Sequence, residues 1–442
     1  MQNELSREYH LSSLIRFTLP TIIMLVFVAT YTIVDGIFVS RYVGTTALSA
    51  MNIVFPLINI LLGLGIMLGT GGSAIIGRKL GEGRTEAARS AFTLITAFAI
   101  GTGLIISLLC LVFIRPLSLF LGADETLLPY CMEYGSIMMT FYTMSVVQTL
   151  FQTLFVTAGK PNLGLWLNVG AGVANIFFDY LFIVKLNMGI AGAAWGTVSG
   201  FLIGGIPALV YFAKPRTVLY FVKPKWNGSI ILRTVLNGSS EMVTSGAMAV
   251  TTFLFNISMM ELLGEDGVAA ITILLYAQFL FSSAYLGFSS GAAPIFSYNY
   301  GARNIVQLKR LFKMCVGIIL VSSLVCFGVS YLLAVPTIAI FTPKDSTTYA
   351  ITLYGYQIFV WNFLFAGINI FASAFFTALS NGKVSALISF LRTFIFVAGS
   401  ILILPKFLGI DGIWLAIPAA EAVTVLIAVG FLAANRKHYH YF

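Results

Sequence analysis

Long apolar segments recur along the whole sequence. Hydrophobic residues make up 59% of the 442 residues, and charged residues only 9%. A helix of about 20 residues crosses the hydrocarbon core of a bilayer, and a backbone in lipid must satisfy its hydrogen bonds internally. The sequence therefore predicts an all-α polytopic membrane protein and excludes a soluble or disordered chain. Twelve transmembrane helices are expected, at residues 14–39, 48–74, 91–113, 128–156, 163–184, 189–213, 230–260, 267–293, 311–340, 349–377, 384–404 and 408–434.

The basic residues indicate how these spans are oriented. The net charge of +9 is spread among short loops, which argues against nucleic acid as a partner. If both termini face the cytoplasm, 20 of the 25 Lys and Arg residues lie on that side. The positive-inside rule therefore predicts a multi-pass protein of the plasma (inner) membrane with both termini cytoplasmic. The five basic residues expected on the outer side are Arg41, Arg115, Lys185, Lys344 and Lys406.

The sequence offers no set of residues for enzymatic chemistry. The motifs HExxH and GxSxG are absent, and the four cysteines lack the spacing of a metal site. His10, His438 and His440 lie in the terminal segments. GSAIIGRK approaches a phosphate-binding loop, but Arg78 and Lys79 stand where that loop requires Lys and then Ser or Thr. We therefore expect neither an enzyme nor a cofactor.

The longest hydrophilic connection lies near the middle of the chain, at residues 214–227, and leaves six spans on each side. Both halves then start in the cytoplasm, which indicates a parallel internal repeat that forms two six-helix bundles. Gly44–Phe92 aligns with Gly264–Phe312 without gaps. The predicted parts are an N-terminal lobe at 1–215, a cytoplasmic linker at 216–229 and a C-terminal lobe at 230–442.

The segment from Asn162 to Val184 is apolar except for one polar stripe. At about 100° per residue, Asn168, Asn175 and Asp179 lie within one arc of roughly 60° on the helix. An ionisable residue in a span costs about 3 kcal/mol or more, so it faces a protein interior or water and has a partner. The stripe therefore indicates either polar packing between helices or an ion or substrate site.

Depth in the membrane groups further residues with this stripe. At about 1.5 Å rise per residue, Asp35 and Thr197 reach the same outer half of the membrane as Asp179. We therefore expect Asp35, Asn175, Asp179 and Thr197 to share one cavity. Thr197 lies beside a ridge of glycines at every fourth position, which would let a neighbouring helix approach closely. These are Gly192, Gly196, Gly200 and Gly204.

The second half of the chain carries a different set of charges. Glu241 lies near the middle of the seventh span, close to Asn237 and Thr244, and either lines a cavity or takes part in polar packing. Arg392 and Glu421 lie at similar depths in spans eleven and twelve. A structural ion pair is the interpretation that we favour for these two.

Several segments resemble one family of transporters. LPTIIMLVFVATYTIVDGIFVSRYVG, from Leu19, NVGAGVANIFFDYLFI and GIAGAAWGT resemble the MATE (multidrug and toxic compound extrusion) transporters, particularly their DinF-like branch. The resemblance covers nearly the whole chain. It implies a V-shaped pair of bundles, the MATE fold, that exports organic and often cationic compounds in exchange for H⁺ or Na⁺.

The resemblance also implies roles for individual residues. The family's first-lobe cation site matches Asp35, Asn175, Asp179 and Thr197, so Na⁺ or H⁺ is expected there. Pro20 matches the proline at which the family's first helix is thought to bend. Glu241 matches an acidic residue of the NorM branch, which also has an aspartate where Asn369 stands here, so Glu241 and Asn369 would form an incomplete second-lobe cavity.

Two physical arguments bear on the coupling ion. The amide and hydroxyl oxygens beside the two carboxylates suit a hard cation such as Na⁺. Two carboxylates that share a site of low dielectric resist double ionisation, which favours H⁺. We prefer H⁺, with no other cofactor.

Two other functions compete with an antiporter of small organic molecules. A lipid-linked saccharide flippase would require a basic cavity for pyrophosphate, whereas the charges in these spans are mainly acidic. A channel or a receptor-like membrane protein is the further alternative. We expect a monomer in the lipid bilayer. Aromatic and methionine side chains such as Phe27, Tyr31, Met248 and Met259 are either contacts for flat apolar cations or simply core and lipid contacts.

Overall fold

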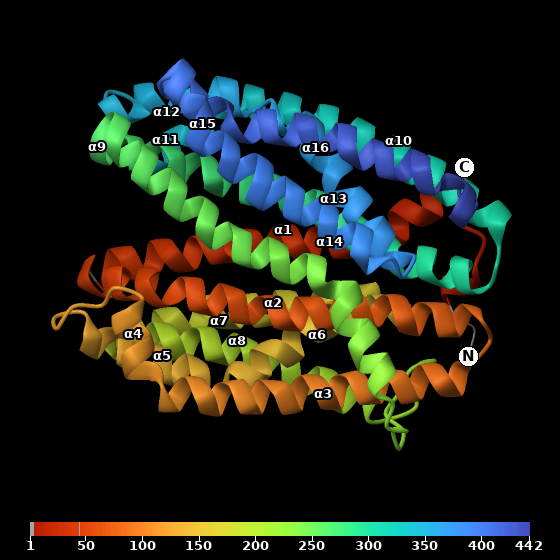
Figure 1. The fold of residues 1–442 in the computed structure, drawn as a ribbon. Helices are drawn as coiled ribbons and strands as arrows, with labels where there is room; N and C mark the ends of the chain where they lie inside the picture. Colours follow the sequence, from red (N-terminus) through yellow and green to blue (C-terminus); the bar gives the residue numbers. More distant parts are fainter. Residues whose placement is uncertain (1–3, 44) are drawn as a thin grey trace.

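The computed structural model describes residues 4–43 and 45–442, without the side chains of residues 36–41, 45, 48 and 56. Gly44, where the predicted repeat starts, and the side chain of Arg41 therefore lie outside the described residues. The first half is built of helices (Figure 1). They are η1 (Glu4–Ser6), α1 (Leu11–Tyr42), α2 (Thr45–Gly81), α3 (Thr85–Val112), α4 (Ile114–Phe120), α5 (Leu128–Thr140), α6 (Tyr142–Thr157), α7 (Pro161–Asp179), η2 (Tyr180–Lys185) and α8 (Gly189–Phe212).

The second half is helical as well, and its first helix reverses direction. Gly264 in α9 has φ 65° and ψ −150°, so the helix is broken there into two antiparallel arms. Both ends of α9 pack on the C-terminal half of α2, the start of α9 near Gly71 and its end near Gly81. The helices are α9 (Gly228–Gly301), α10 (Ile305–Leu332), α11 (Ala334–Phe341), α12 (Thr347–Phe359), α13 (Asn362–Ala378), α14 (Gly382–Phe390), η3 (Leu391–Val397), α15 (Ala398–Leu408) and α16 (Ile410–Tyr439).

The expected twelve spans are present, although two of them are broken. Within the described ranges, nine helical runs are long and apolar enough to cross a membrane, or ten if α12 and α13, bent by 54°, form one span. Counting the arms of α9 separately and joining α5 to α6 brings the number to twelve. The sequence predicted 128–156 and 349–377 as continuous helices. Both contain a break, at Phe141 and at Val360–Trp361.

The irregularities of the first half recur in the second. The fourth span is interrupted before α6 at Phe141, and the tenth before α13 at Trp361, in the same register that aligns Phe92 with Phe312. Gly189 and Gly409, which match in this register too, have φ 59° and 57° at the start of the sixth and twelfth spans. The short helices α4 and α11 follow the third span of each half. This agreement confirms the parallel repeat.

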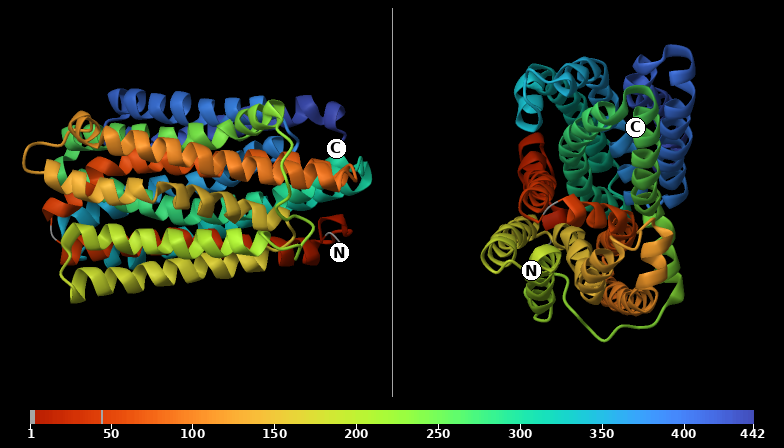
Figure 2. Two further views of the ribbon diagram at one scale, coloured as in Figure 1. Left: turned by 90° about the horizontal axis from the view of Figure 1, so that it is seen from below. Right: turned by 90° about the vertical axis from the view of Figure 1, so that its left-hand side faces the viewer.

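Each bundle has its own apolar core, and α1 contributes to the packing of both. Residues of α2 to α8 form one core, and residues of α9 to α16 form the other. Leu14 and Phe17, at the start of α1, belong to the core of the second bundle. Further along, Phe27 and Tyr31 of α1 lie against Gly172 of α7 in the first bundle. Helix α1 therefore lies between the lobes (Figures 1 and 2).

Glycines join the two lobes at one end of the molecule. A Cβ atom at Gly71 would lie 2.1 Å from the carbonyl oxygen of Thr234, and one at Gly81 would lie 2.0 Å from that of Tyr298. Only a residue without a side chain allows α2 and α9 to approach this closely. Both termini lie at this same end (Figures 1 and 2), which we call the closed end.

The N-terminal segment, residues 4–10, also connects the lobes at the closed end. Glu4 packs against Gly159 of the first lobe, while Gln307 of the second lobe donates a hydrogen bond to the carbonyl oxygen of Tyr9, at 3.2 Å. His10 Nδ1 lies 2.5 Å from Arg310 Nη2. This segment must rearrange whenever the two lobes separate at this end.

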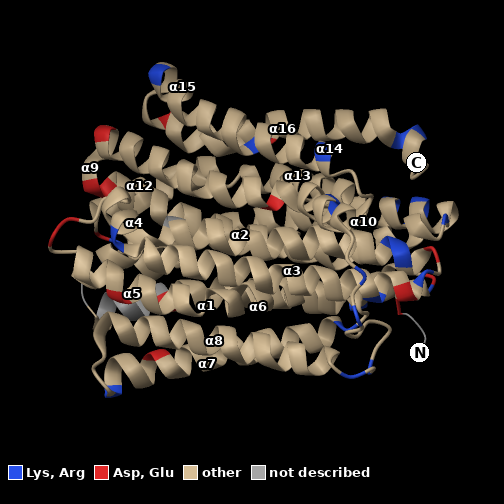
Figure 3. Cartoon of the chain, turned by 60° about the horizontal axis from the view of Figure 1, so that its bottom comes forward, with Lys and Arg blue, Asp and Glu red and all other residues tan. Residues whose placement is uncertain are grey.

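The basic side chains gather at the closed end. Figure 3 shows Lys and Arg concentrated where both termini lie, with fewer at the other end. This distribution is the one that the positive-inside rule uses to assign the cytoplasmic side.

Candidate functional site

Asp179 lies at the end of α7, and Gly196 of α8 makes room for it. The residue is 1% exposed. A Cβ atom at position 196 would lie 1.7 Å from Asp179 Oδ1, so no other residue type fits without displacing the carboxylate. A π-helical turn, η2, starts at the next residue, and such turns often mark functional sites. The prediction that the glycines of α8 allow close packing is confirmed.

Asp35 of α1 completes a pair of facing carboxyl groups. The side chains of Asp35 and Asp179 lie within hydrogen-bonding range of each other, and Asn175 lies beside Asp179. Gly172, one turn before Asn175, allows this approach, because a Cβ there would lie 2.6 Å from the ring of Phe27. The structure thus brings together three of the four residues predicted for the first-lobe site.

The fourth predicted residue, Thr197, is half-buried in α8, next to Gly196 in the sequence. Its hydroxyl donates to the carbonyl oxygen of Ala193 in its own helix, at 3.2 Å, rather than to a carboxylate. The lone pairs of its oxygen remain as potential ligands.

The oxygen atoms of this site lack donors. Within the part of the chain that the structure describes, Asp35 Oδ1, both carboxylate oxygens of Asp179 and Asn175 Oδ1 are buried without a hydrogen-bond partner. Buried polar atoms are rarely left unpaired, because each costs about 1–3 kcal/mol. Two facing carboxylates need a proton or a cation between them. The donor set, made of oxygen atoms only, fits H⁺ and also a hard cation such as Na⁺.

Tyr134 belongs to the same site, and sequence reasoning missed it. It lies in α5, is 4% exposed and is close enough to both Asp35 and Asp179 to interact electrostatically. Its neighbour Glu133 is exposed. The site-facing side of α5 had no polar stripe that could have identified this tyrosine.

The other end of the polar stripe on α7 is fully paired. Asn168 accepts a hydrogen bond from Gln152 at 2.8 Å and one from Gln148 at 3.5 Å, and it donates to the carbonyl oxygen of Gly164 at 2.9 Å. The packing interpretation of the stripe therefore holds for Asn168, and the ion-site interpretation stays a prediction for the other end. Asn168 serves packing between α6 and α7, and Asn175 with Asp179 forms the candidate ion site.

Pro20 lies inside α1, which continues from Leu11 to Tyr42 without interruption. Its ring removes one backbone hydrogen bond from the helix. The next residues, Thr21 and Ile22, contact Gly287 of α9, where a Cβ would lie 2.6 Å from the Cα of Ile22. Pro20 is thus located where α1 contacts the second lobe. Its role in helix bending stays a prediction.

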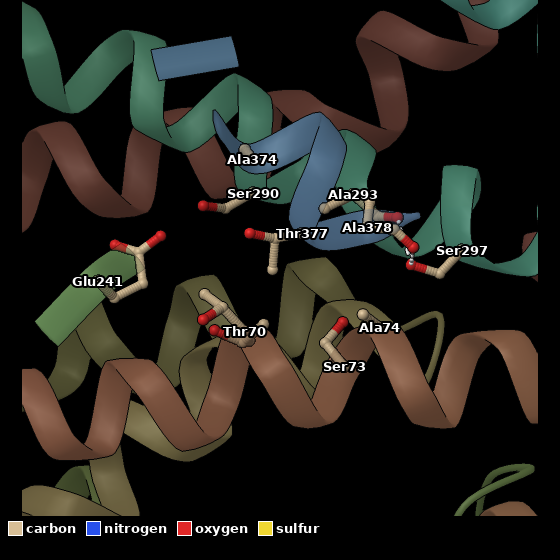
Figure 4. A pocket seen from close by; sticks show the side chains of 11 residues that line it. Thr70, Ser73, Ala74, Glu241, Ser290, Ala293, Ser297, Ala374, Thr377 and Ala378 are labelled. Carbon is tan, nitrogen blue, oxygen red and sulfur yellow. Dashed lines mark hydrogen bonds between the residues drawn. The ribbon is translucent and has the colours of Figure 1, made fainter. Parts of the chain in front are cut away.

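Glu241 lines a small polar cavity between the lobes. Figure 4 shows its carboxylate pointing into the space between α2 and α9. The cavity has room for little more than one water molecule. Asn237 instead donates to the carbonyl oxygen of Thr377, at 2.9 Å, and so serves packing. The hydroxyl groups that line the cavity belong to Thr70, Ser73, Thr153, Ser290, Ser297 and Thr377.

Asn369 is not part of this cavity, contrary to the expectation that it would join Glu241. It is fully buried and donates to Glu421, at 2.7 Å to Oε2 and at 2.9 Å to the backbone carbonyl oxygen. Arg392 contacts the same carboxylate, with Nε 2.9 Å and Nη2 2.5 Å from Oε1. The structure therefore brings Arg392 and Glu421 together as an ion pair and adds Asn369 to it.

Comparison with known proteins assigns the chain to a family. The MatE family model matches residues 20–181 and again residues 242–402, once in each half of the repeat. The chain belongs to the MATE family. It is therefore a membrane transporter that handles small molecules in a lipid bilayer. MATE proteins form a transporter family and not an enzyme class.

Individual relatives are similar over nearly their whole length. The chain is 20% identical to the multidrug export protein MepA of Staphylococcus saprophyticus over 424 residues, 94% of this chain and 92% of the relative. A multidrug resistance MATE transporter of the MOP superfamily, solved in an outward-facing conformation, superposes with a TM-score of 0.93, at 21% identity and with 100% and 99% of the chains covered. A MATE structure in a straight conformation gives 0.92, at 20% identity and with 98% and 97% covered. The MATE fold of two bundles is thus established.

Proposed function

We propose that this protein is a secondary active antiporter of the plasma membrane that exports organic, cationic and amphipathic compounds in exchange for H⁺ or Na⁺. The observation that carries the proposal is the group of donor-free oxygens on Asp35, Asn175 and Asp179, buried between α1, α7 and α8. The staphylococcal relatives named as multidrug export proteins support the class of substrate. A monomer suffices for this function, because each chain contains both lobes.

Ion uptake at the site changes the force between two helices. With both carboxylates charged at about 4 Å, repulsion amounts to about 4 kcal/mol at an effective dielectric constant of 20. One proton or one cation removes most of this repulsion and lets Asp35 approach Asp179. Loading and unloading of the site therefore favours two different positions of α1 relative to α7.

Helix α1 connects this site to the contact between the lobes. Tyr31 lies one turn before Asp35 and packs on Gly172, whereas Ile22 and Thr18 pack on Gly287 and Gly291 of α9. A displacement of α1 at Asp35 thus acts on the lobe contact, with Pro20 between the two packing sites on α9. This arrangement supports alternating access, in which the closed end is cytoplasmic and opens in the other half of the cycle.

The ion pair in the second lobe argues against the flippase alternative. A pyrophosphate group would need a free basic side chain in the cavity. Arg392, the basic residue deep in the spans of the second lobe, is neutralised by Glu421. The donor-free oxygens around Asp35 and Asp179 are carboxylate and amide oxygens, and they suit cations.

The coupling ion is tested with purified protein in liposomes. A fluorescent organic cation is followed while either a pH gradient or a Na⁺ gradient is imposed alone. We expect transport with the pH gradient in Na⁺-free buffer. Transport with Na⁺ at equal pH and none with the pH gradient would reverse the preference for H⁺. No transport of any organic cation under either gradient would contradict the proposed function.

A further inference from the structure

The buried carboxylates of the two lobes differ in their hydrogen-bond partners. In the first lobe, Asp35 and Asp179 have oxygens without donors. In the second lobe, Glu421 is 1% exposed and both of its carboxylate oxygens accept hydrogen bonds. The positive charge beside Glu421 is the guanidinium group of Arg392, which belongs to the chain and cannot dissociate.

The hydrogen bonds of Glu421 leave little room for another ion. Arg392 Nε lies 2.9 Å from Oε1 and 3.1 Å from Oε2, and Nη2 lies 2.5 Å from Oε1. Asn369 Nδ2 binds Oε2 at 2.7 Å and the backbone oxygen of the same residue at 2.9 Å. A guanidinium that binds both oxygens in this way is a strong, directional partner. The carboxylate therefore has its full charge compensated without any mobile cation.

The internal repeat shows that this arrangement belongs to the second lobe alone. In the repeat, the span that starts with α7 corresponds to the span that starts with α14, and α8 corresponds to α16. In the register that aligns Phe92 with Phe312, Arg392 corresponds to Gly172. When Gly189 is aligned with Gly409, Glu421 corresponds to Phe201. Neither counterpart is charged, so the pair is not required by the packing of a MATE bundle.

We propose that Arg392 is a tethered counter-ion that keeps Glu421 from taking up a coupling ion and so confines ion coupling to the first lobe. The proposal rests on the proposed antiport function. Removal of the guanidinium leaves Glu421 and Asn369 Oδ1 as buried acceptors, the same kind of set that Asp35, Asp179 and Asn175 form. The emptied position then takes up a proton or Na⁺. Arg392 is thus a residue that determines how many ions the protein binds, besides stabilising the fold.

The test counts bound ions in four forms of the full-length protein. These are the wild type, Arg392→Met, Glu421→Gln and the double variant Arg392→Met/Glu421→Gln. Protons are counted with an indicator dye as the pH of unbuffered, detergent-purified protein is stepped through the neutral range, and Na⁺ is counted by equilibrium dialysis with the radioactive ion. Because the cycle compares differences, ions at Asp35, Asp179 or Glu241 cancel.

The expected result is one additional ion per molecule in Arg392→Met, counted as H⁺ or Na⁺, and its loss when Glu421→Gln is added. Glu421→Gln alone should leave the ion count unchanged. Equal counts in Arg392→Met and in the double variant would overturn the proposal and leave the pair a structural one. Arg392→Lys keeps a tethered cation and should bind the wild-type number of ions.

A second measurement applies if Arg392→Met does not fold. The neutral double variant Arg392→Met/Glu421→Met replaces the pair by apolar side chains, which is often tolerated. Its ratio of ions to substrate in liposomes should equal that of the wild type, and a changed ratio would overturn the proposal. Failure of the proposed function appears separately, as a wild type that shows no ion-driven transport at all.

Discussion

Gly196→Ala is the substitution that tests the geometry of the ion site most sharply. A methyl group at position 196 would lie 1.7 Å from Asp179 Oδ1, 2.7 Å from Cγ and 3.1 Å from the backbone nitrogen. The backbone contact is relieved by a shift of a few tenths of an ångström, whereas the carboxylate must turn away. We therefore expect the substitution to displace Asp179 from Asp35 while α7 and α8 stay packed.

The magnitude follows from the cost of forcing an extra methyl group into a packed interior, about 1–3 kcal/mol. If only the ion-bound state is destabilised by this amount, ion affinity falls by about 5- to 150-fold. The assay is dye transport in liposomes as a function of the imposed pH gradient, with thermal stability measured on the same preparation. We expect the gradient required for half-maximal transport to rise and the melting temperature to change little.

Gly170→Ala is the matched control, because a Cβ atom at Gly170 meets nothing within 4 Å. It adds the same methyl group to α7 and should transport like the wild type. Gly196→Ala with wild-type transport would refute the placement of Asp179 against α8. A strong loss of stability in Gly196→Ala would show that the helices, rather than the carboxylate, absorb the methyl group.

Three further outcomes are expected. Gly71→Ala places a Cβ 2.1 Å from a backbone oxygen of α9, so cysteines introduced near the closed end should become more accessible to a polar maleimide. Gly101→Ala, with open space around it, should leave labelling unchanged. Equal labelling in Gly71→Ala and the wild type would contradict the closed-end contacts. Arg392→Met should cost less than the about 3–5 kcal/mol of a stranded buried charge, because Glu421 takes up an ion, but the lost guanidinium hydrogen bonds should still reduce the folded yield seen by size-exclusion chromatography. A second, apolar replacement of Glu421 should restore part of the yield, and normal yield in the single variant would count against the buried pair. Tyr9→Ala removes a side chain that is 3% exposed and should lower the free energy of unfolding by about 3 kcal/mol or more. An unchanged melting temperature would show that the N-terminal segment does not stabilise the contact between the lobes.

The number of spans and the internal repeat could be predicted because both depend on local properties of the sequence. Apolar length fixes where a helix can cross the bilayer, and glycines at matching positions survive in both halves. The breaks at Phe141 and at Val360–Trp361 could not be predicted in the same way. Neither contains a glycine or a proline, and the bend depends on packing between helices that are distant in the sequence.

The candidate site was predictable to the extent that depth in the membrane determines neighbours. Asp35 and Asp179 have predicted depths that agree, and the structure places them together. Tyr134 was missed because the site-facing side of α5 is set by tertiary packing. Asn369 was assigned to the wrong cavity, because sequence position gives the depth of a residue but not the direction in which its side chain points.

In the proposed mechanism, Asp35 and Asp179 together bind the ion that drives export. The most direct measurement compares Asp35→Asn, Asp179→Asn and the wild type in liposomes with the same imposed ion gradient, at matched protein incorporation. Each variant keeps the shape of the side chain and removes its charge, so size-exclusion profiles should match the wild type. We expect gradient-driven accumulation of the organic cation to be lost in both variants. Wild-type accumulation in both would contradict it.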